Sequence, residues 1–335
     1  MSAQVFTGAA VFDGMRLHPG ASLRVEDGRV AGPGPGEVIR LDGGILAPGF
    51  LDLQVNGAGG RMVDGSTTAD WLAEMCDIHG RLGATGILPT LITDTAEATA
   101  QVIASGVEAA RRQTPGFLGL HLEGPHLDPR RKGAHDPALI RPMQEEDLSR
   151  LLDAAARLPS LMVTLAPAAV TPDQIARLAA AGVIVSLGHS DCSHAEAKVA
   201  ITAGASCATH LFNAMSQLGN RDPGLVGAAL TGPVHAGLIA DGIHVAPETI
   251  RIAMAASDLL FLVSDAMAAA GSDLTEFTLN GRRILRRDGS LRLEDGTLAG
   301  ADLALARAVA VMTEIGATPE TALAMATSRP AACLR

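Results

Sequence analysis

Two residues that could bind a metal ion or a proton lie at the end of one apolar segment. Residues 117–123 are apolar enough for a buried strand, and they carry His121 and Glu123 before the chain turns at Gly124 and Pro125. Residues two apart in a strand share a face, and a carboxylate in apolar surroundings needs a charge partner or a metal. A salt-bridged buried glutamate is the alternative. The case for a metal therefore depends on residues elsewhere in the chain.

Other titratable residues follow further apolar segments in the same way, and together the candidates are Glu123, His189, His210, His244 and Asp265. Glu123, His189 and His210 supply three N/O ligands, the number that a catalytic zinc-type site uses while it leaves one position for water. Asp265 is placed to take a proton from an attacking water and return it to a leaving group. Its alternative role is an N-cap of the following segment. The pattern predicts a hydrolytic metal centre.

The elements that must position these residues alternate between strands and helices from about residue 45 onward. The expected strands are residues 45–55, 86–90, 117–123, 161–165, 183–187, 207–210, 236–239 and 261–263. The expected helix N-caps include Thr68, Thr171, Ser193 and Thr318. Eight such units predict an α/β fold, a closed (β/α)8 TIM-like barrel, whose active site lies at the carboxyl ends of the strands.

Two smaller β-rich regions accompany the expected barrel. Residues 1–47 contain short β-like segments separated by Asp-Gly and Gly-Pro turns, so we expect a small antiparallel, β-sandwich-like domain there. Residues 48–335 are expected to form the barrel. A hairpin is expected near residues 277–298, where apolar and polar residues alternate again around one Asn-Gly turn and one Asp-Gly turn. The domain boundary is therefore predicted between residues 47 and 48.

Composition limits the possible partners. The 335 residues are 47% hydrophobic and 19% charged, which allows a large core. A net charge of −10 argues against a nucleic-acid or anionic membrane surface, so an anionic substrate needs a local cluster of positive charge. The four cysteines show no Cys-x-x-Cys spacing, and neither a signal peptide nor a membrane-length apolar run is recognisable. We therefore expect a soluble, cytoplasmic protein.

Several longer motifs follow one another along the chain. They are Pro-Gly-Phe-Leu-Asp-Leu-Gln-Val-Asn-Gly at 48–57, His-Leu-Glu-Gly-Pro at 121–125, Lys-Gly-Ala-His at 132–135, Gly-His-Ser at 188–190, Thr-His-Leu-Phe-Asn-Ala-Met at 209–215, Asp-Gly-Ile-His-Val at 241–245 and Val-Ser-Asp-Ala at 263–266. In this order they resemble the motifs of the N-acetylglucosamine-6-phosphate deacetylase family in the amidohydrolase superfamily, and the resemblance runs from about Val5 to Arg335. It implies metal-dependent hydrolysis of the N-acetyl group of N-acetylglucosamine 6-phosphate, giving glucosamine 6-phosphate and acetate.

The resemblance also implies a role for each matching residue. Glu123, His189 and His210 would hold the metal, and Asp265 would be the general base that later protonates the leaving amine. The residues that would contact the amino-sugar phosphate are His135, Asn213, Ala214, Arg221 and His244. Arg221 would take the phosphate, because a guanidinium stays charged at any working pH and binds in a bidentate manner. The resemblance further implies a homodimer.

Three features depart from the family's pattern. Many amidohydrolases carry His-x-His at the end of the first strand for a second metal, whereas this chain has Gln54 and Asn56 there, so we expect one divalent metal per subunit. Zinc is favoured, with iron, manganese and cobalt as alternatives. His126 replaces an aromatic residue and is expected to pack rather than to ligate. The chain stops at Arg335, where family members continue with strands of the small domain, which would leave strand edges uncovered.

Two alternative functions remain open from the sequence. Another amidohydrolase, acting on a different amide, would use the same centre, and equal activity on unphosphorylated N-acetylglucosamine would favour it. A catalytically inactive sugar-phosphate-binding protein is the other alternative. The intact candidate residues argue against it, because buried polar groups that serve no purpose are costly to keep.

Overall fold

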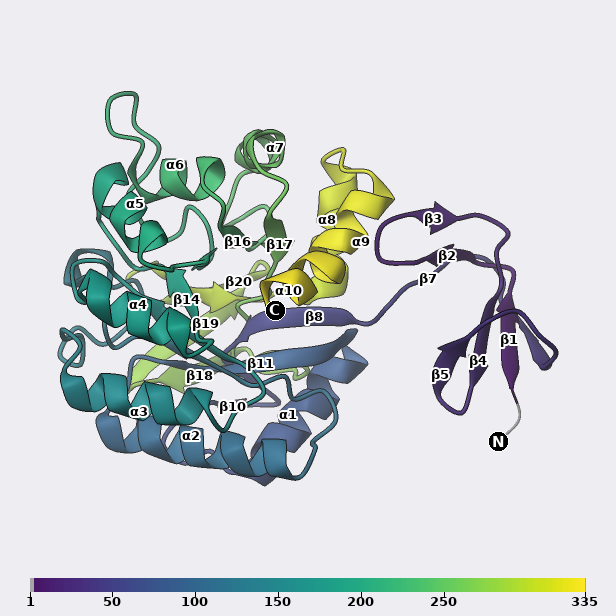
Figure 1. Ribbon diagram of the computed structural model, residues 1–335, viewed down its shortest axis with the longest axis horizontal. Coiled ribbons are helices and arrows are strands. Elements are labelled where there is room, and N and C mark those ends of the chain that lie inside the picture. Colours follow the sequence, from purple (N-terminus) through teal and green to yellow (C-terminus); the bar gives the residue numbers. More distant parts are fainter. Residues whose placement is uncertain (1–2, 335) are drawn as a thin grey trace.

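The computed structural model describes residues 3–334, and its centre is an eight-stranded parallel sheet curled into a barrel (Figure 1). In spatial order the strands are β8 (Phe50–Val55), β11 (Ala84–Ile92), β12 (Leu120–Glu123), β13 (Leu161–Leu165), β14 (Ile184–Leu187), β15 (Cys207–Ala208), β16 (His235–Leu238) and β17 (Leu260–Leu262). The predicted TIM-like barrel is confirmed, because sequential strands pair in parallel around the sheet.

Several strand ends differ from the prediction. The strand expected at 45–55 is divided into β7 (Ile45–Leu46) and β8, with Pro48, which has no N–H to donate, between them. The strand expected at 117–123 begins only at Leu120, and Phe117 keeps a single bridge to Ile87. The strand expected at 207–210 ends at Ala208, because the backbone of His210 turns into the left-handed region.

Helices cover the outside of the barrel (Figure 1). They are α1 (Ala69–Arg81), α2 (Ala96–Arg111), α3 (Glu145–Ala155), α4 (Pro172–Ala180), α5 (His194–Thr202), α6 (Gly224–Thr231), α7 (Pro247–Ala256), α8 (Leu305–Glu314), α9 (Pro319–Ala326) and α10 (Ser328–Cys333), with a short 3-10 helix, η1 (Pro129–Arg131). The predicted N-caps are confirmed, since Thr68, Thr171, Ser193 and Thr318 each accept a backbone N–H three residues on. Among residues 3–334, no helix combines the length and apolar character needed to cross a bilayer.

The joint between the first and last barrel strands differs from the other joints. Within residues 3–334, β8 and β17 share no continuous ladder, and Val55 pairs with Ala266 in an isolated bridge beyond the end of β17. The buried side chain of Asp52 spans this joint, where one carboxylate oxygen accepts the Ser264 N–H at 3.1 Å. The Asp265 N–H then donates to the carbonyl of Gln54 at 3.0 Å. At this joint, hydrogen bonds to the Asp52 side chain therefore take the place of part of the backbone ladder.

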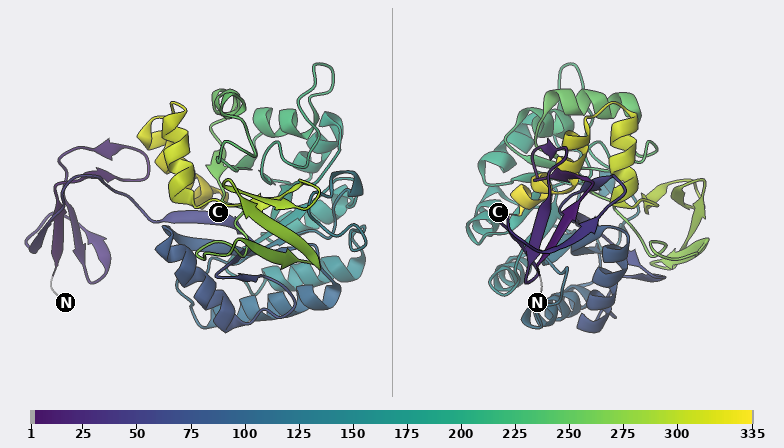
Figure 2. Two further views of the ribbon diagram at one scale, coloured as in Figure 1. Left: turned by 180° about the vertical axis from the view of Figure 1, so that it is seen from behind. Right: turned by 90° about the vertical axis from the view of Figure 1, so that its right-hand side faces the viewer.

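The N-terminal strands form two small sheets that stand beside the barrel (Figures 1 and 2). One sheet contains β1 (Gln4–Thr7), β4 (Leu23–Glu26), β5 (Arg29–Ala31) and β6 (Glu37–Arg40), and the other contains β2 (Ala10–Phe12), β3 (Leu17–His18) and β7. Both sheets are mixed, because β6 runs parallel to β1 and β7 runs parallel to β2. Val30 and Val38 are 73% and 64% exposed, respectively. The domain boundary at residues 47 and 48 stays a prediction.

The inserted segment is larger than the expected hairpin. It is a four-stranded antiparallel sheet of β18 (Glu276–Leu279), β19 (Arg282–Arg287), β20 (Ser290–Leu293) and β21 (Leu298–Ala301), which we call the insertion sheet. It has a small core of its own that includes Leu279, Ile284 and Leu291. Figure 2 shows it lying against one face of the barrel, near the short hairpin of β9 (Gly57–Ala58) and β10 (Arg61–Met62). Ala301 pairs with Ala266, so the sheet is tied directly to the segment that carries Asp265.

Candidate active site

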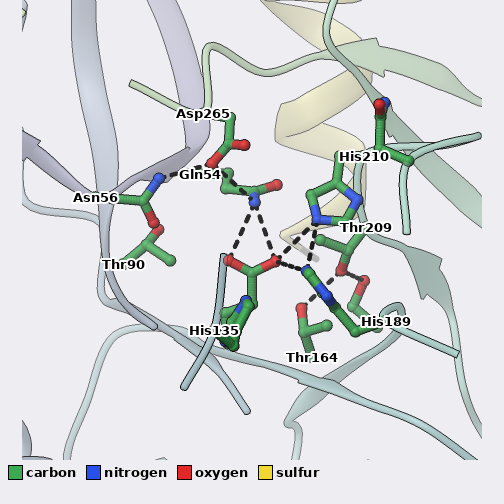
Figure 3. Close-up of polar contacts among 12 residues, drawn as sticks. Gln54, Asn56, Thr90, His135, Thr164, His189, Thr209, His210 and Asp265 are labelled. Carbon is green, nitrogen blue, oxygen red and sulfur yellow. Dashed lines mark hydrogen bonds and ion pairs between the residues drawn. The ribbon is translucent and has the colours of Figure 1, made fainter. Parts of the chain in front are cut away.

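Three side chains from the ends of barrel strands converge on one point (Figure 3). The Oε1 atom of Glu123 lies 3.2 Å from Nε2 of His189 and 3.0 Å from Nε2 of His210. The two Nε2 atoms are 3.0 Å apart. The residues are 2–4% exposed, so the sequence-predicted ligand candidates meet in one buried cluster.

The backbone explains how residues so far apart in the chain aim at one point. His189, His210 and Asp265 each follow a barrel strand and adopt left-handed backbone, with φ values of 44°, 29° and 50°. This conformation is unfavourable for residues other than glycine, and such strain concentrates at functional sites. Each strand thus ends in a sharp turn, and the side chain at that turn faces the cavity.

The donor set of the cluster fits a divalent cation. Nδ1 of His189 lies 2.8 Å from the carbonyl oxygen of Arg131, which can only accept, so Nδ1 carries a hydrogen and Nε2 is the ring nitrogen that could bind a cation. Nε2 faces Nε2 of His210 and the carboxylate of Glu123. Tetrahedral ligands at zinc-type bond lengths lie about 3.3–3.5 Å from one another, close to the separations observed here.

The charges within the cluster support the same assignment. Burial acts to raise the pKa of Glu123, but the hydrogen bonds and charges of His189 and His210 hold it well below its usual range. Burial acts to lower the pKa of His210, but the Glu123 carboxylate raises it overall. Glu123 therefore stays anionic, as a metal ligand must.

Asp265 faces this cluster and is held by two amide side chains (Figure 3). Its Oδ1 accepts from Nδ2 of Asn56 at 2.6 Å and from Nε2 of Gln54 at 3.2 Å. The same Gln54 nitrogen lies 3.3 Å from both carboxylate oxygens of Glu123. Burial, with the nearby charge of Glu123, raises the pKa of Asp265 to about 6. Gln54 thus contacts both carboxylates, and Asn56 contacts Asp265 alone. Both side chains act as hydrogen-bond donors at the strand end where many amidohydrolases carry two further metal ligands.

A cavity of about 550 Å³ opens above the cluster. Of the predicted substrate-contacting residues, its lining includes His135, Asn213, Ala214 and His244. Nδ1 of His135 lies 2.8 Å from Oγ1 of Thr93, and its ring stacks edge-on with that of His189. Nδ1 of His244 donates its hydrogen to the Asp241 carboxylate at 2.6 Å. In the neutral ring, Nε2 then carries a lone pair and not a hydrogen.

Two residues considered from the sequence lie elsewhere. Arg221 is exposed on the loop that precedes α6, it does not line the cavity, and it forms no ion pair within residues 3–334. Its role stays a prediction. His126 is buried outside the cavity, with Nδ1 3.2 Å from the carbonyl oxygen of Arg141, so it packs as expected.

Sequence reasoning missed several residues of the site. Asp241 orients His244, and the Asp-Gly-Ile-His spacing could have revealed it, because an aspartate in a turn accepts the N–H groups two and three residues on. Thr93 binds His135 from another strand end, and no local pattern marks it. Arg292 lines the cavity from the insertion sheet, far from every motif considered above.

Comparisons with known proteins agree with this geometry. Residues 45–335 match the model of the Amidohydrolase family. An N-acetylgalactosamine-6-phosphate deacetylase from Shewanella sp. (strain ANA-3) is 43% identical over 87% of this chain and 75% of its own length. The structure of an N-acetylglucosamine-6-phosphate deacetylase from Pasteurella multocida superposes with a TM-score of 0.94 at 34% identity, covering 99% of this chain and 90% of that one.

A further solved structure adds a substrate to the comparison. It is an aspartate-to-alanine mutant of the N-acetyl-D-glucosamine-6-phosphate deacetylase from Mycobacterium smegmatis in complex with N-acetyl-D-glucosamine 6-phosphate. It is 30% identical, with a TM-score of 0.90, and the match covers 100% of this chain and 91% of that one. The barrel, the buried Glu-His-His cluster and these similarities place the chain in the amidohydrolase family, among the amino-sugar-6-phosphate deacetylases.

Proposed function

We propose that this protein hydrolyses the N-acetyl group of N-acetylglucosamine 6-phosphate to give glucosamine 6-phosphate and acetate, with one divalent metal per subunit. The observation that carries the proposal is the convergence of Glu123, His189 and His210 in the same cavity as Asp265. The M. smegmatis relative binds this substrate, which supports its choice. Zinc suits a ligand set of one carboxylate and two imidazoles, and iron, manganese and cobalt are the alternatives.

Amide hydrolysis requires a stronger nucleophile than water and a proton for the leaving nitrogen. A divalent cation held by Glu123, His189 and His210 would lower the pKa of water and polarise the amide carbonyl. Oδ1 of Asp265 is occupied by Asn56 and Gln54, so its Oδ2 is the atom that takes the proton from the attacking water. As the carbon–nitrogen bond breaks, Asp265 returns this proton to the amine, and it is ready for another turnover.

The cavity residues would hold the sugar against this centre. Nε2 of His244 and the ring of His135 present polar atoms to a bound ligand, and Asn213 and Ala214 line the wall next to His210. Arg221 lies outside the cavity of its own subunit, so its proposed contact with phosphate would be made in the cavity of a second copy, within a homodimer. Its exposure on a loop supports that arrangement.

A second candidate substrate is N-acetylgalactosamine 6-phosphate, the epimer at C4. The observation that favours it is the 43% identity with a deacetylase of that name. Both sugars carry the same amide and the same phosphate, so the metal centre serves either one. The two substrates must therefore be compared directly.

The decisive experiment is metal analysis of the purified protein, followed by acetate release from both 6-phosphates and from unphosphorylated N-acetylglucosamine. We expect about one divalent metal per chain and turnover of a 6-phosphate with higher kcat/KM than the free sugar. Equal turnover of the free sugar would indicate a different amidohydrolase. Binding without turnover in the presence of added metal would indicate an inactive sugar-phosphate-binding protein.

We propose a cytoplasmic location as well. Cys76, Cys192, Cys207 and Cys333 are all buried free thiols. Unpaired thiols suit a reducing compartment, where disulfides are rare. Trapping of free thiols in protein taken directly from cells would test this, and oxidised cysteines would contradict it.

A further inference from the structure

Two turns beside the candidate metal cluster are hydrogen-bonded to each other. The η1 turn, residues 128–131, follows β12, and the ligand turn, residues 189–191, follows β14 and begins with His189. The Asp128 N–H donates to the carbonyl oxygen of His189 at 2.9 Å. Nδ1 of His189 donates in the opposite direction, to the carbonyl oxygen of Arg131 at 2.8 Å. The orientation of this imidazole therefore depends on where the η1 turn lies.

Charged side chains hold the two turns together. The Asp191 carboxylate, on the ligand turn, accepts from Nε of Arg131 at 2.8 Å and from its Nη2 at 2.7 Å. Nη1 of Arg130 lies 3.4 Å from the other oxygen of this carboxylate. The side chains of Arg131 and Asp191 are only 37% and 31% exposed, so salt screens this pair less than it screens a pair on the open surface. Asp191 thus fixes the side chain of the same residue whose carbonyl oxygen binds His189.

A buried carboxylate supports the same arrangement from inside. The side chain of Asp128 accepts from Nε and Nη2 of Arg130, and it also accepts the Arg130 N–H at 3.0 Å. The Asp191 N–H donates to Oδ2 of this carboxylate at 3.2 Å, so Asp128 binds both turns at once. Its charge is balanced by a guanidinium, as a buried carboxylate requires. These contacts restrain the η1 turn from moving away from His189.

The chain just beyond the η1 turn packs on the same imidazole ring. Gly133 has left-handed backbone, with a φ of 53°, and a Cβ atom added there would lie 3.2 Å from Cε1 of His189. The ring of His135 lies edge-on to that of His189, with the two centroids 4.3 Å apart. A displacement of the η1 turn would therefore disturb the His189 ring at several points.

We propose that Asp191 is a positioning residue of the metal centre. Through Arg131 it keeps the η1 turn against His189, so that Nε2 of His189 stays directed at the cation. This inference rests on the proposed metal centre but not on the identity of the sugar. A metal-bound histidine usually donates its second N–H to a protein oxygen, which fixes the ring and raises its basicity. Here that oxygen is a backbone carbonyl, so it is kept in place by the contacts that hold its turn.

The test is Asp191→Asn, which keeps the size of the side chain and removes its charge. The measurement is binding of Zn²⁺ to the metal-free protein in competition with a chromophoric chelator, which requires no turnover. We expect the Kd for Zn²⁺ to rise roughly tenfold, the lower end of the range typical for changes to the outer partners of metal ligands. The visible d–d spectrum of the Co²⁺-loaded protein should also change, because one ligand is reoriented. An unchanged Kd or an unchanged spectrum would overturn the proposal.

Arg131→Gln separates positioning from simple charge effects. It removes a positive charge near the cation and leaves the backbone carbonyl, so electrostatics alone would make Zn²⁺ bind more tightly. The proposal instead predicts binding roughly tenfold weaker. The double variant should bind no more weakly than either single variant, because all three break the same ion pair. Tighter binding by Arg131→Gln, or losses that add in the double variant, would overturn the proposal. If Asp191→Asn does not fold, Arg131→Gln decides alone.

A matched control is Glu145→Gln. Glu145 on α3 pairs with Arg177 on α4 at 2.6 Å, so this ion pair also joins two elements, and neither residue lines the cavity. The variant loses the same charge as Asp191→Asn without touching either turn. It should bind Zn²⁺ as the wild type does. An equal rise of the Kd in Glu145→Gln and Asp191→Asn would overturn the proposal.

Failure of the proposed function would be recognised separately. If the wild type binds Zn²⁺ but releases acetate from neither 6-phosphate, the proposed reaction is wrong, and the Zn²⁺ affinities still decide the role of Asp191. If the reaction proceeds but Asp191→Asn binds Zn²⁺ as the wild type does, only the role of Asp191 is wrong. If the wild type binds no divalent ion, the metal centre and this role fail together.

Discussion

The floor and the rim of the cavity are built differently. The floor consists of barrel strand ends, where Glu123, His189 and His210 are buried and contact one another at 3.0–3.2 Å. The rim includes the insertion sheet, where Arg292 and the turn at residues 294–297 are exposed. The candidate reacting groups therefore lie on elements fixed by the barrel, whereas the rim also carries exposed side chains whose replacement should cost little stability. Floor variants should affect every substrate, and rim variants should affect selectivity.

The largest effect is expected from the floor variant Asp265→Asn. An amide cannot take the proton from the attacking water, so kcat should fall roughly 10³-fold or more on phosphorylated and free sugar alike. Metal content should stay near that of the wild type, because Asp265 is outside the Glu123–His189–His210 cluster. Acetate release and elemental analysis of the same sample provide the measurement. Retained activity would remove Asp265 from the mechanism.

A smaller floor effect is expected from Asn56→Ala. This change removes the 2.6 Å hydrogen bond to Oδ1 of Asp265 and leaves the weaker one from Gln54. The carboxylate loses its fixed orientation, so kcat should fall roughly tenfold while KM changes little. Steady-state kinetics on both substrates would show it. A loss confined to the phosphorylated substrate would contradict the division between floor and rim.

The last prediction concerns stability rather than turnover. Burial raises the pKa of Asp52 to about 7, from an ordinary value of 3.8. Between these values the folded state binds more protons than the unfolded state, so the contribution of Asp52 to the free energy of unfolding is lost as the pH rises through 7. Asp52→Asn stays neutral, so its stability relative to wild type should improve between pH 5 and pH 8, by up to about 3 kcal/mol. Urea unfolding at both pH values measures this, and a constant difference would refute it.

The barrel and the floor could be predicted from the sequence because both depend on local patterns. A parallel barrel places the carboxyl ends of all its strands at one mouth, so polar residues after apolar strands, such as Glu123 and His210, must meet there. The rim depends on how an irregular segment folds back over that mouth. Nothing near Arg292 in the sequence indicates that it reaches the cavity, and nothing near Arg221 indicates that it lies outside it. Asp52 was missed because its partner Ser264 is 212 residues away.

The unusual joint between β8 and β17 has a consequence for the way this protein would fail. The candidate metal ligands belong to the continuous run of strands β12 to β15, whereas Asp265 and its amide partners Gln54 and Asn56 lie on the two sides of the joint. Partial opening at this point would carry the proton acceptor away while the cation stayed bound. Under mild denaturing stress, the population that accumulates first should therefore be loaded with metal yet inert, and metal content would overestimate the amount of working enzyme.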